Sequence, residues 1–163
     1  MLSGLHFDIQ SFLAWGGARI INEIQFDRGI GGYLKQAADA NTVELAKERL
    51  ITAVEEAKRR GYTSGFTSIL YTTPDEDVGF WFNNLSVSLK ELNEVRPDAS
   101  LLERSNVLLK LRQTLLDHTQ SGEKITAPGG ITIFPSNGLF LLWALLSIVL
   151  GVVFCVVAVA TPD

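Results

Sequence analysis

The chain has 163 residues, of which 47% are hydrophobic and 20% charged, and its formal net charge is −4. A single cysteine excludes a disulfide-stapled fold, and the ordinary content of glycine and proline excludes collagen-like and disordered classes. Every Lys and Arg, and every acidic residue except Asp163, lies at or before Lys124. This division into a charged and an uncharged part argues against a fully soluble protein.

The first predicted helix covers residues 8–39, where Ile20, Ile24 and Leu34 form a partial apolar stripe. Paired glycines at 16–17 and the Gly-Ile-Gly-Gly run at 29–32 predict breaks or kinks in it. The start of the chain is not a secretory signal peptide, because it lacks a basic segment and carries Asp8 where an apolar run is required.

The second predicted helix covers residues 42–60, with Asn41 as its cap and Glu44 at capping-box spacing. Its apolar stripe consists of Val43, Ala46, Leu50, Ala53, Val54 and Ala57. The basic residues at 58–60 favour the negative end of the helix dipole, and a contact with a phosphate or lipid headgroup is the alternative.

The third predicted helix has the clearest start signal, with Thr73 as N-cap, Pro74 at the first helical position and Glu76 three residues after the cap. Its predicted buried face consists of Val78, Trp81, Phe82, Leu85, Leu89, Leu92 and Val95. Phe80 cannot share that face, because each helical step turns by about 100°. Phe80, with Phe66 and Tyr71 from the loop at 61–73, therefore forms a possible partner surface, and local packing under this loop is the alternative.

The fourth predicted helix runs from about Ser100 to His118, with Leu101, Leu108 and Leu115 at seven-residue spacing. Short connections at 39–41 and 96–99 favour antiparallel neighbours. The sequence thus predicts an all-α fold, an antiparallel bundle of about four helices over residues 1–120 that is followed by one C-terminal transmembrane helix.

A Pro/Gly-rich linker at 121–137 follows the bundle, and Pro128 and Pro135 forbid a continuous helix through it. Part of the linker, residues 131–134, is predicted to be extended. Residues 138–160 then form an uncharged run of 23 residues, about 34 Å long as a helix and enough to cross a hydrocarbon core of about 30 Å. Residues 161–163 form a short tail.

Small residues recur along one side of the predicted transmembrane helix. They would allow close approach of another transmembrane helix, and they are Ala144, Ser147, Gly151, Cys155 and Ala158. Phe134, Phe140 and Trp143 are predicted to lie at the membrane interface, where aromatic side chains are enriched.

The sequence carries few residues that could support catalysis. Only His6, His118 and Cys155 could support Cys/His catalysis, and no GxSxG, SxxK or HExxH motif is present, so no enzyme activity, cofactor or metal site is predicted. We therefore expect a single-pass membrane-anchored helical interaction protein, an accessory or structural subunit of a larger membrane assembly. An extracytoplasmic four-helix sensor or ligand-binding module is the alternative.

The expected partners are the lipid bilayer and other transmembrane helices, or a second copy of the chain. Nucleic acid is not expected, because the net charge is negative and no basic face stands out. Because no signal peptide is present and all positive charges precede the span, the bundle is expected in the cytoplasm, with the span as a tail anchor.

Overall fold

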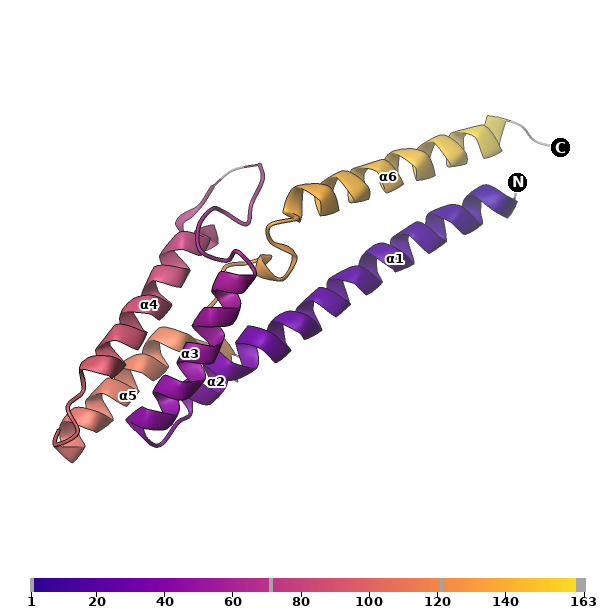
Figure 1. Ribbon diagram of the computed structural model, residues 1–163. Coiled ribbons are helices and arrows are strands. Elements are labelled where there is room, and N and C mark those ends of the chain that lie inside the picture. Colours follow the sequence, from indigo (N-terminus) through magenta and orange to yellow (C-terminus); the bar gives the residue numbers. More distant parts are fainter. Residues whose placement is uncertain (1, 71, 121, 161–163) are drawn as a thin grey trace.

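A computed structural model describes the backbone of residues 2–70, 72–120 and 122–160, with side chains from Gln10 onward except those of Phe154 and Ala158. The described chain is mostly helical, with one small two-stranded sheet. Four helices form a bundle, and two longer helices extend from it side by side as an arm (Figure 1). We use "the arm" for helix α1 (Leu2–Phe26) together with helix α6 (Asn137–Ala160).

Helix α1 starts at Leu2 and does not break at Gly16 or Gly17, contrary to the sequence expectation. Nothing lies within 4 Å of a Cβ built on either glycine, so no close approach forces a kink there. At its far end, α1 continues through a π-helical segment, Asp27–Gly31, into α2 (Gly32–Ala38). The predicted break at 29–32 is therefore a change of helical pitch within one continuous rod.

Helices α3 (Val43–Arg59), α4 (Val78–Glu94) and α5 (Leu101–Leu115) complete the bundle with α2. Every residue of the predicted stripe on α3 is buried. The α4 face is also confirmed, because its predicted residues are buried or half-buried. The core is filled by large apolar side chains from all four helices and the π segment, chiefly Ile30, Leu34, Leu50, Val78, Leu85 and Leu115.

The helix caps differ from the predicted ones by a few residues. The hydroxyl of Thr42, rather than Asn41, accepts the capping bond at the start of α3, from the N–H of Leu45 at 3.2 Å. The capping box of Thr73 and Glu76 is present, but it starts a short 3₁₀ turn, Pro74–Glu76. Asp77 then caps α4 by accepting from the N–H of Phe80 at 2.9 Å.

A β-hairpin follows α5, where the sequence predicted a helix as far as His118. Strands β1 (Leu116–Thr119) and β2 (Gly122–Ile125) pair antiparallel, and Leu116 lies opposite Ile125. Burial of Leu116 against the core favours the extended conformation, and Arg112 of α5 pairs with both Asp39 and Glu123. His118 therefore lies on a strand, 81% exposed, with its Nδ1 3.6 Å from a carboxylate oxygen of Glu123.

The linker returns the chain from the hairpin to the arm. The indole N–H of Trp81 donates a 2.8 Å hydrogen bond to the carbonyl of Thr126, which ties the linker to α4. A 3₁₀ turn, Ile131–Ile133, stands where an extended segment was predicted, because the side chain of Ile131 is buried in the core. The Phe134–Pro135 peptide is cis, and α6 begins two residues later.

Candidate membrane-interaction site

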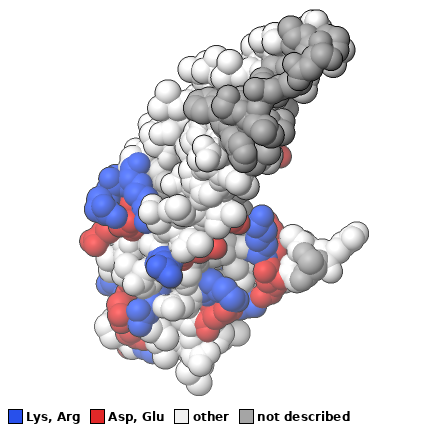
Figure 2. Space-filling model, turned by 90° about the vertical axis from the view of Figure 1, so that its right-hand side faces the viewer, with Lys and Arg blue, Asp and Glu red and all other residues white. Residues whose placement is uncertain are grey.

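Helix α6 has the length and composition of a membrane span. Among the described residues, it is the one helix that is long and apolar enough to cross a bilayer. It carries no charged residue, and large apolar side chains are exposed along it, from Leu139 at 69% to Val159 at 82%. On the face shown in Figure 2, blue and red side chains gather over the bundle while the arm is almost entirely white or grey.

One side of α6 is covered by α1. The hydroxyls of Ser11 and Ser147 lie 3.2 Å apart, and the indole N–H of Trp143 donates to the Ser11 hydroxyl at 2.9 Å. The indole N–H of Trp15 donates to the carbonyl of Phe140 at 3.2 Å. These bonds join residues more than 120 positions apart in the sequence, and they hold the two helices antiparallel (Figure 1).

Aromatic side chains gather along the contact between α1 and α6. Phe140 packs against Trp143 with ring centroids 6.3 Å apart, and Phe12 stacks on Trp15 at 6.1 Å. The guanidinium of Arg19 lies 5.0 Å from the Trp15 ring, a cation–π distance. Sequence reasoning missed the α1 half of this cluster, although the spacing of Ser11 and Trp15, with no Lys or Arg before Arg19, was a usable signal.

The residues of the predicted small-residue stripe differ in their exposure and contacts. Ser147 contacts Ser11, while Ala144 lines a shallow groove with Trp15, and both are half-buried, as is Gly151. Cys155 is exposed. Ala158 belongs to α6, but its side chain lies outside the described residues. Ala144 and Ser147 therefore lie on the half of α6 that faces α1, whereas no described atom lies within 4 Å of a Cβ built on Gly151.

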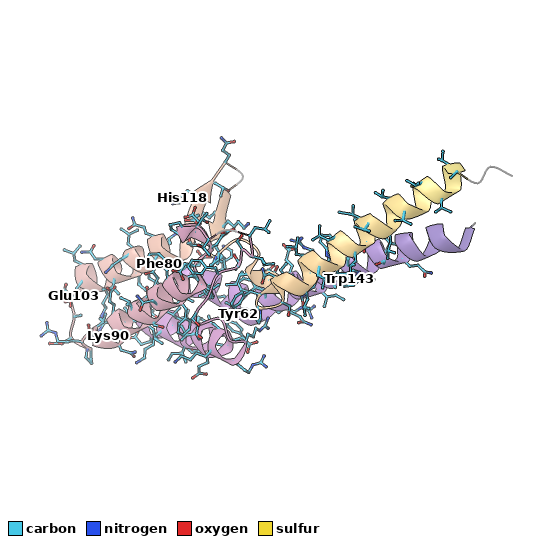
Figure 3. The ribbon with its side chains drawn as sticks, turned by 90° about the horizontal axis from the view of Figure 1, so that it is seen from above. Tyr62, Phe80, Lys90, Glu103, His118 and Trp143 are labelled. Atoms are coloured by element: carbon cyan, nitrogen blue, oxygen red, sulfur yellow. The ribbon has the colours of Figure 1, made fainter. Side chains whose placement is uncertain are left out.

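The three predicted interface aromatics lie in two environments. Phe140 and Trp143 belong to the arm. Phe134 instead packs edge-on against Tyr62, with centroids 5.9 Å apart, and is half-buried beside the bundle core. Figure 3 shows Tyr62 at the base of the arm and Trp143 on α6.

The predicted partner surface is only partly described. Phe80 is 62% exposed and Phe66 is 42% exposed. Phe66 forms an isolated antiparallel bridge with Asp77, so its loop lies beside the start of α4. Tyr71 lies outside the described residues. Ile69 and Leu70, from the same loop, are also exposed, and they line the groove with Trp15 and Phe140.

Charged groups surround the base of the arm. The Glu56 carboxylate accepts hydrogen bonds from Arg59 and Arg60, at 2.7 and 2.6 Å from their Nε atoms. These two guanidinium groups, Arg59 first, lower the pKa of Glu56 to about 2, against the opposing effect of its partial burial. Arg60 also donates to the carbonyl of Gln25 in α1 at 3.0 Å. The basic end of α3 thus lies beside the point where the arm begins.

Comparison with models of known protein families, with curated proteins and with solved structures finds no match for this chain. Within the described ranges, no group of three or more His, Cys, Asp or Glu side chains is placed to hold a metal ion.

Proposed function

We propose that this chain is a membrane-anchored helical interaction protein, an accessory or structural subunit of a larger membrane assembly. The observation that carries the proposal is the contrast between helix α6, which is uncharged and exposes large apolar side chains, and the charged bundle. A soluble protein of this size rarely leaves a contiguous apolar surface of such length exposed to water. Lipid is the environment that such a surface fits.

The proposed orientation places the bundle in the cytoplasm. Arg59 and Arg60 lie beside the arm, and Arg19 lies on the Trp15 ring at the level where α6 begins. Basic residues that flank a span favour the cytoplasmic side. These arginines support the cytoplasmic orientation more strongly than Lys124 does, because the linker separates Lys124 from α6.

The proposed partner surface consists of Phe66 and Phe80, on the loop after α3 and the first turn of α4. Exposed aromatic side chains are frequent anchors in protein interfaces, whereas most other surface residues contribute little. The surface lies on the bundle, so a partner could bind it while α6 remains in the bilayer.

The test is native electrophoresis of the tagged full-length chain, purified from membranes in mild detergent. Wild type is expected to migrate as an assembly larger than one chain, and Phe80→Ser is expected to lose it. Leu109→Ser on α5 is the matched control, because Leu109 is similarly exposed at 55%. A wild-type chain that migrates alone would contradict the interaction role, and equal effects of the two variants would contradict the Phe80 surface.

A further inference from the structure

We propose that the first two thirds of α1, residues 2–18, lie inside the bilayer as a second membrane segment antiparallel to α6, with the outer face against lipid acyl chains. The inference rests on the proposed function, in which α6 spans the membrane. Insertion of α1 gives the chain two membrane segments instead of one. The Leu2 end of α1 and the Ala160 end of α6 then lie on the same side of the membrane, away from the bundle (Figure 1).

The depth of the α1–α6 contact carries the argument. Ser147 lies nine residues after Gly138, about 14 Å along the helix, which is close to the middle of a hydrocarbon core of about 30 Å. Ser11 lies within 3.2 Å of Ser147, measured between hydroxyl oxygens. When α6 spans, Ser11 is therefore near the bilayer centre, and α1 cannot lie on the membrane surface.

The length of α1 also matches the thickness of the hydrocarbon core. From Ser11, α1 continues nine residues to Leu2, about another 14 Å toward the far side. In the other direction, Trp15 reaches the carbonyl of Phe140, and Arg19 stands one turn further along α1. Arg19 is the first Lys or Arg of the sequence, so positive charge begins where α1 leaves the hydrocarbon region.

The outer face of α1 continues the apolar surface of α6. Phe12 and Leu13 are 65% and 66% exposed, although both are large apolar side chains. The neighbouring face of α6 exposes Leu and Val side chains over the same span. The polar atoms of Ser11, Trp15 and Trp143 are instead bonded between the two helices, as groups inside hydrocarbon must be.

Helix α1 would not enter the bilayer alone. It is less apolar than α6, the one described helix long and apolar enough to cross a bilayer, and it carries His6, Asp8 and Gln10. A carboxylate inside the hydrocarbon region is unfavourable, and the contacts with α6 must offset this cost. The proposed partner of this segment is thus the lipid on one side and α6 on the other.

The test is labelling of single cysteines in sealed membrane vesicles with a membrane-impermeant maleimide, before and after addition of detergent. The full-length chain carries Cys155→Ala, and each variant adds one cysteine at Lys58, Ser3 or Ala160. Lys58, exposed at the end of α3, reports the bundle side. We expect Ala160→Cys to label from the opposite side, and Ser3→Cys to label with it or to be shielded until detergent is added.

Two further variants form a matched pair on the outer face of α1. Leu13→Cys is expected to react at least about tenfold more slowly than Ile24→Cys in sealed vesicles, because water is absent from the hydrocarbon core. Both side chains are exposed, at 66% and 45%, so their intrinsic accessibility in the fold is similar. Detergent that dissolves the vesicles should bring the two rates together.

The outcomes separate the two proposals. Labelling of Ser3→Cys from the Lys58 side, or equal rates for Leu13→Cys and Ile24→Cys, would overturn the insertion of α1 while α6 still spans. Labelling of Ala160→Cys from the Lys58 side would instead show that α6 does not span, and the proposed function itself would fail.

Discussion

The guanidinium of Arg60, at the end of α3, donates a 3.0 Å hydrogen bond to the backbone carbonyl of Gln25 near the end of α1. The same side chain, 21% exposed, donates to Glu56 at 2.6 Å. One arginine therefore joins the bundle to the arm and is itself oriented by an acid of its own helix.

Arg60→Met is expected to reduce the free energy of unfolding by about 1 kcal/mol, because it removes a charge-assisted bond to Gln25 and the contact with Glu56. Thermal unfolding in detergent micelles would measure the loss. Arg59→Met is the matched control, since Arg59 is 71% exposed and pairs with Glu56 of its own helix rather than with α1. A loss as large in Arg59→Met would show that the bond to Gln25 contributes nothing.

The lowered pKa of Glu56 predicts that the free energy of unfolding depends on pH. Its pKa is lowered from the ordinary value of 4.5 to about 2, so its stabilising contribution is present above pH 4.5 and is lost as the pH falls toward 2. Glu56→Gln should remove this part, about 1 kcal/mol at neutral pH given the exposure of Arg59. Unfolding measured from pH 7 to pH 2 should therefore show the difference between wild type and Glu56→Gln shrink below pH 4.5. A difference that is constant with pH would contradict the assignment.

Gly29 and Gly16 should respond differently to alanine. A Cβ at Gly29 would lie 2.5 Å from Nη2 of Arg60, so Gly29→Ala must displace this side chain from Gln25, and the resulting penalty of about 1 kcal/mol is expected to cancel the gain in helix propensity. Gly16 has no neighbour within 4 Å of its built Cβ, and Gly16→Ala should stabilise the helix by about 0.5–1 kcal/mol. In an Arg60→Met background the Gly29→Ala penalty should fall, and a penalty that persists would assign it to the backbone instead.

The contact between α1 and α6 predicts a specific disulfide. In a Cys155→Ala background, Ser11→Cys with Ser147→Cys should cross-link under mild oxidation in membranes, because the two hydroxyl oxygens lie 3.2 Å apart. Ser11→Cys with Ile148→Cys is the matched control, because Ile148 is 62% exposed and points elsewhere. To detect the disulfide, the chain is cleaved between the bundle and the arm and separated on a gel without reductant. Fragments joined by the disulfide migrate together, and unlinked fragments migrate separately. Equal cross-linking of both pairs would contradict a fixed register.

The helices of the bundle were predictable because their signals are local. The stripe of α3 from Val43 to Ala57 repeats with the helical period, and Ser100 caps α5 by accepting from the N–H of Glu103, as its spacing indicates. The uncharged run that forms α6 was equally clear. Such features depend on residues within a few turns of one another.

The errors concern features that depend on distant residues. The hairpin after Leu115 exists because Leu116 is buried and β2 returns beside it, and neither is visible in a local window. The contact of α1 with α6, next to Gly16, joins residues more than 120 positions apart in the sequence. The seven-residue spacing on α5 does not mark burial, because Leu101 is 86% exposed whereas Leu115 is 1% exposed.

The π segment between α1 and α2 has a mechanical consequence. It leaves no flexible joint between Ser11 in the arm and the fully buried Leu34 in the bundle, since Leu2 to Ala38 is helical throughout. A tilt of the arm relative to the bundle must therefore bend this rod or displace Leu34 from its packing against neighbouring helices. The bundle is accordingly held at one angle to the arm, and in the proposed arrangement this rigid connection would set the height and direction of the bundle relative to the bilayer.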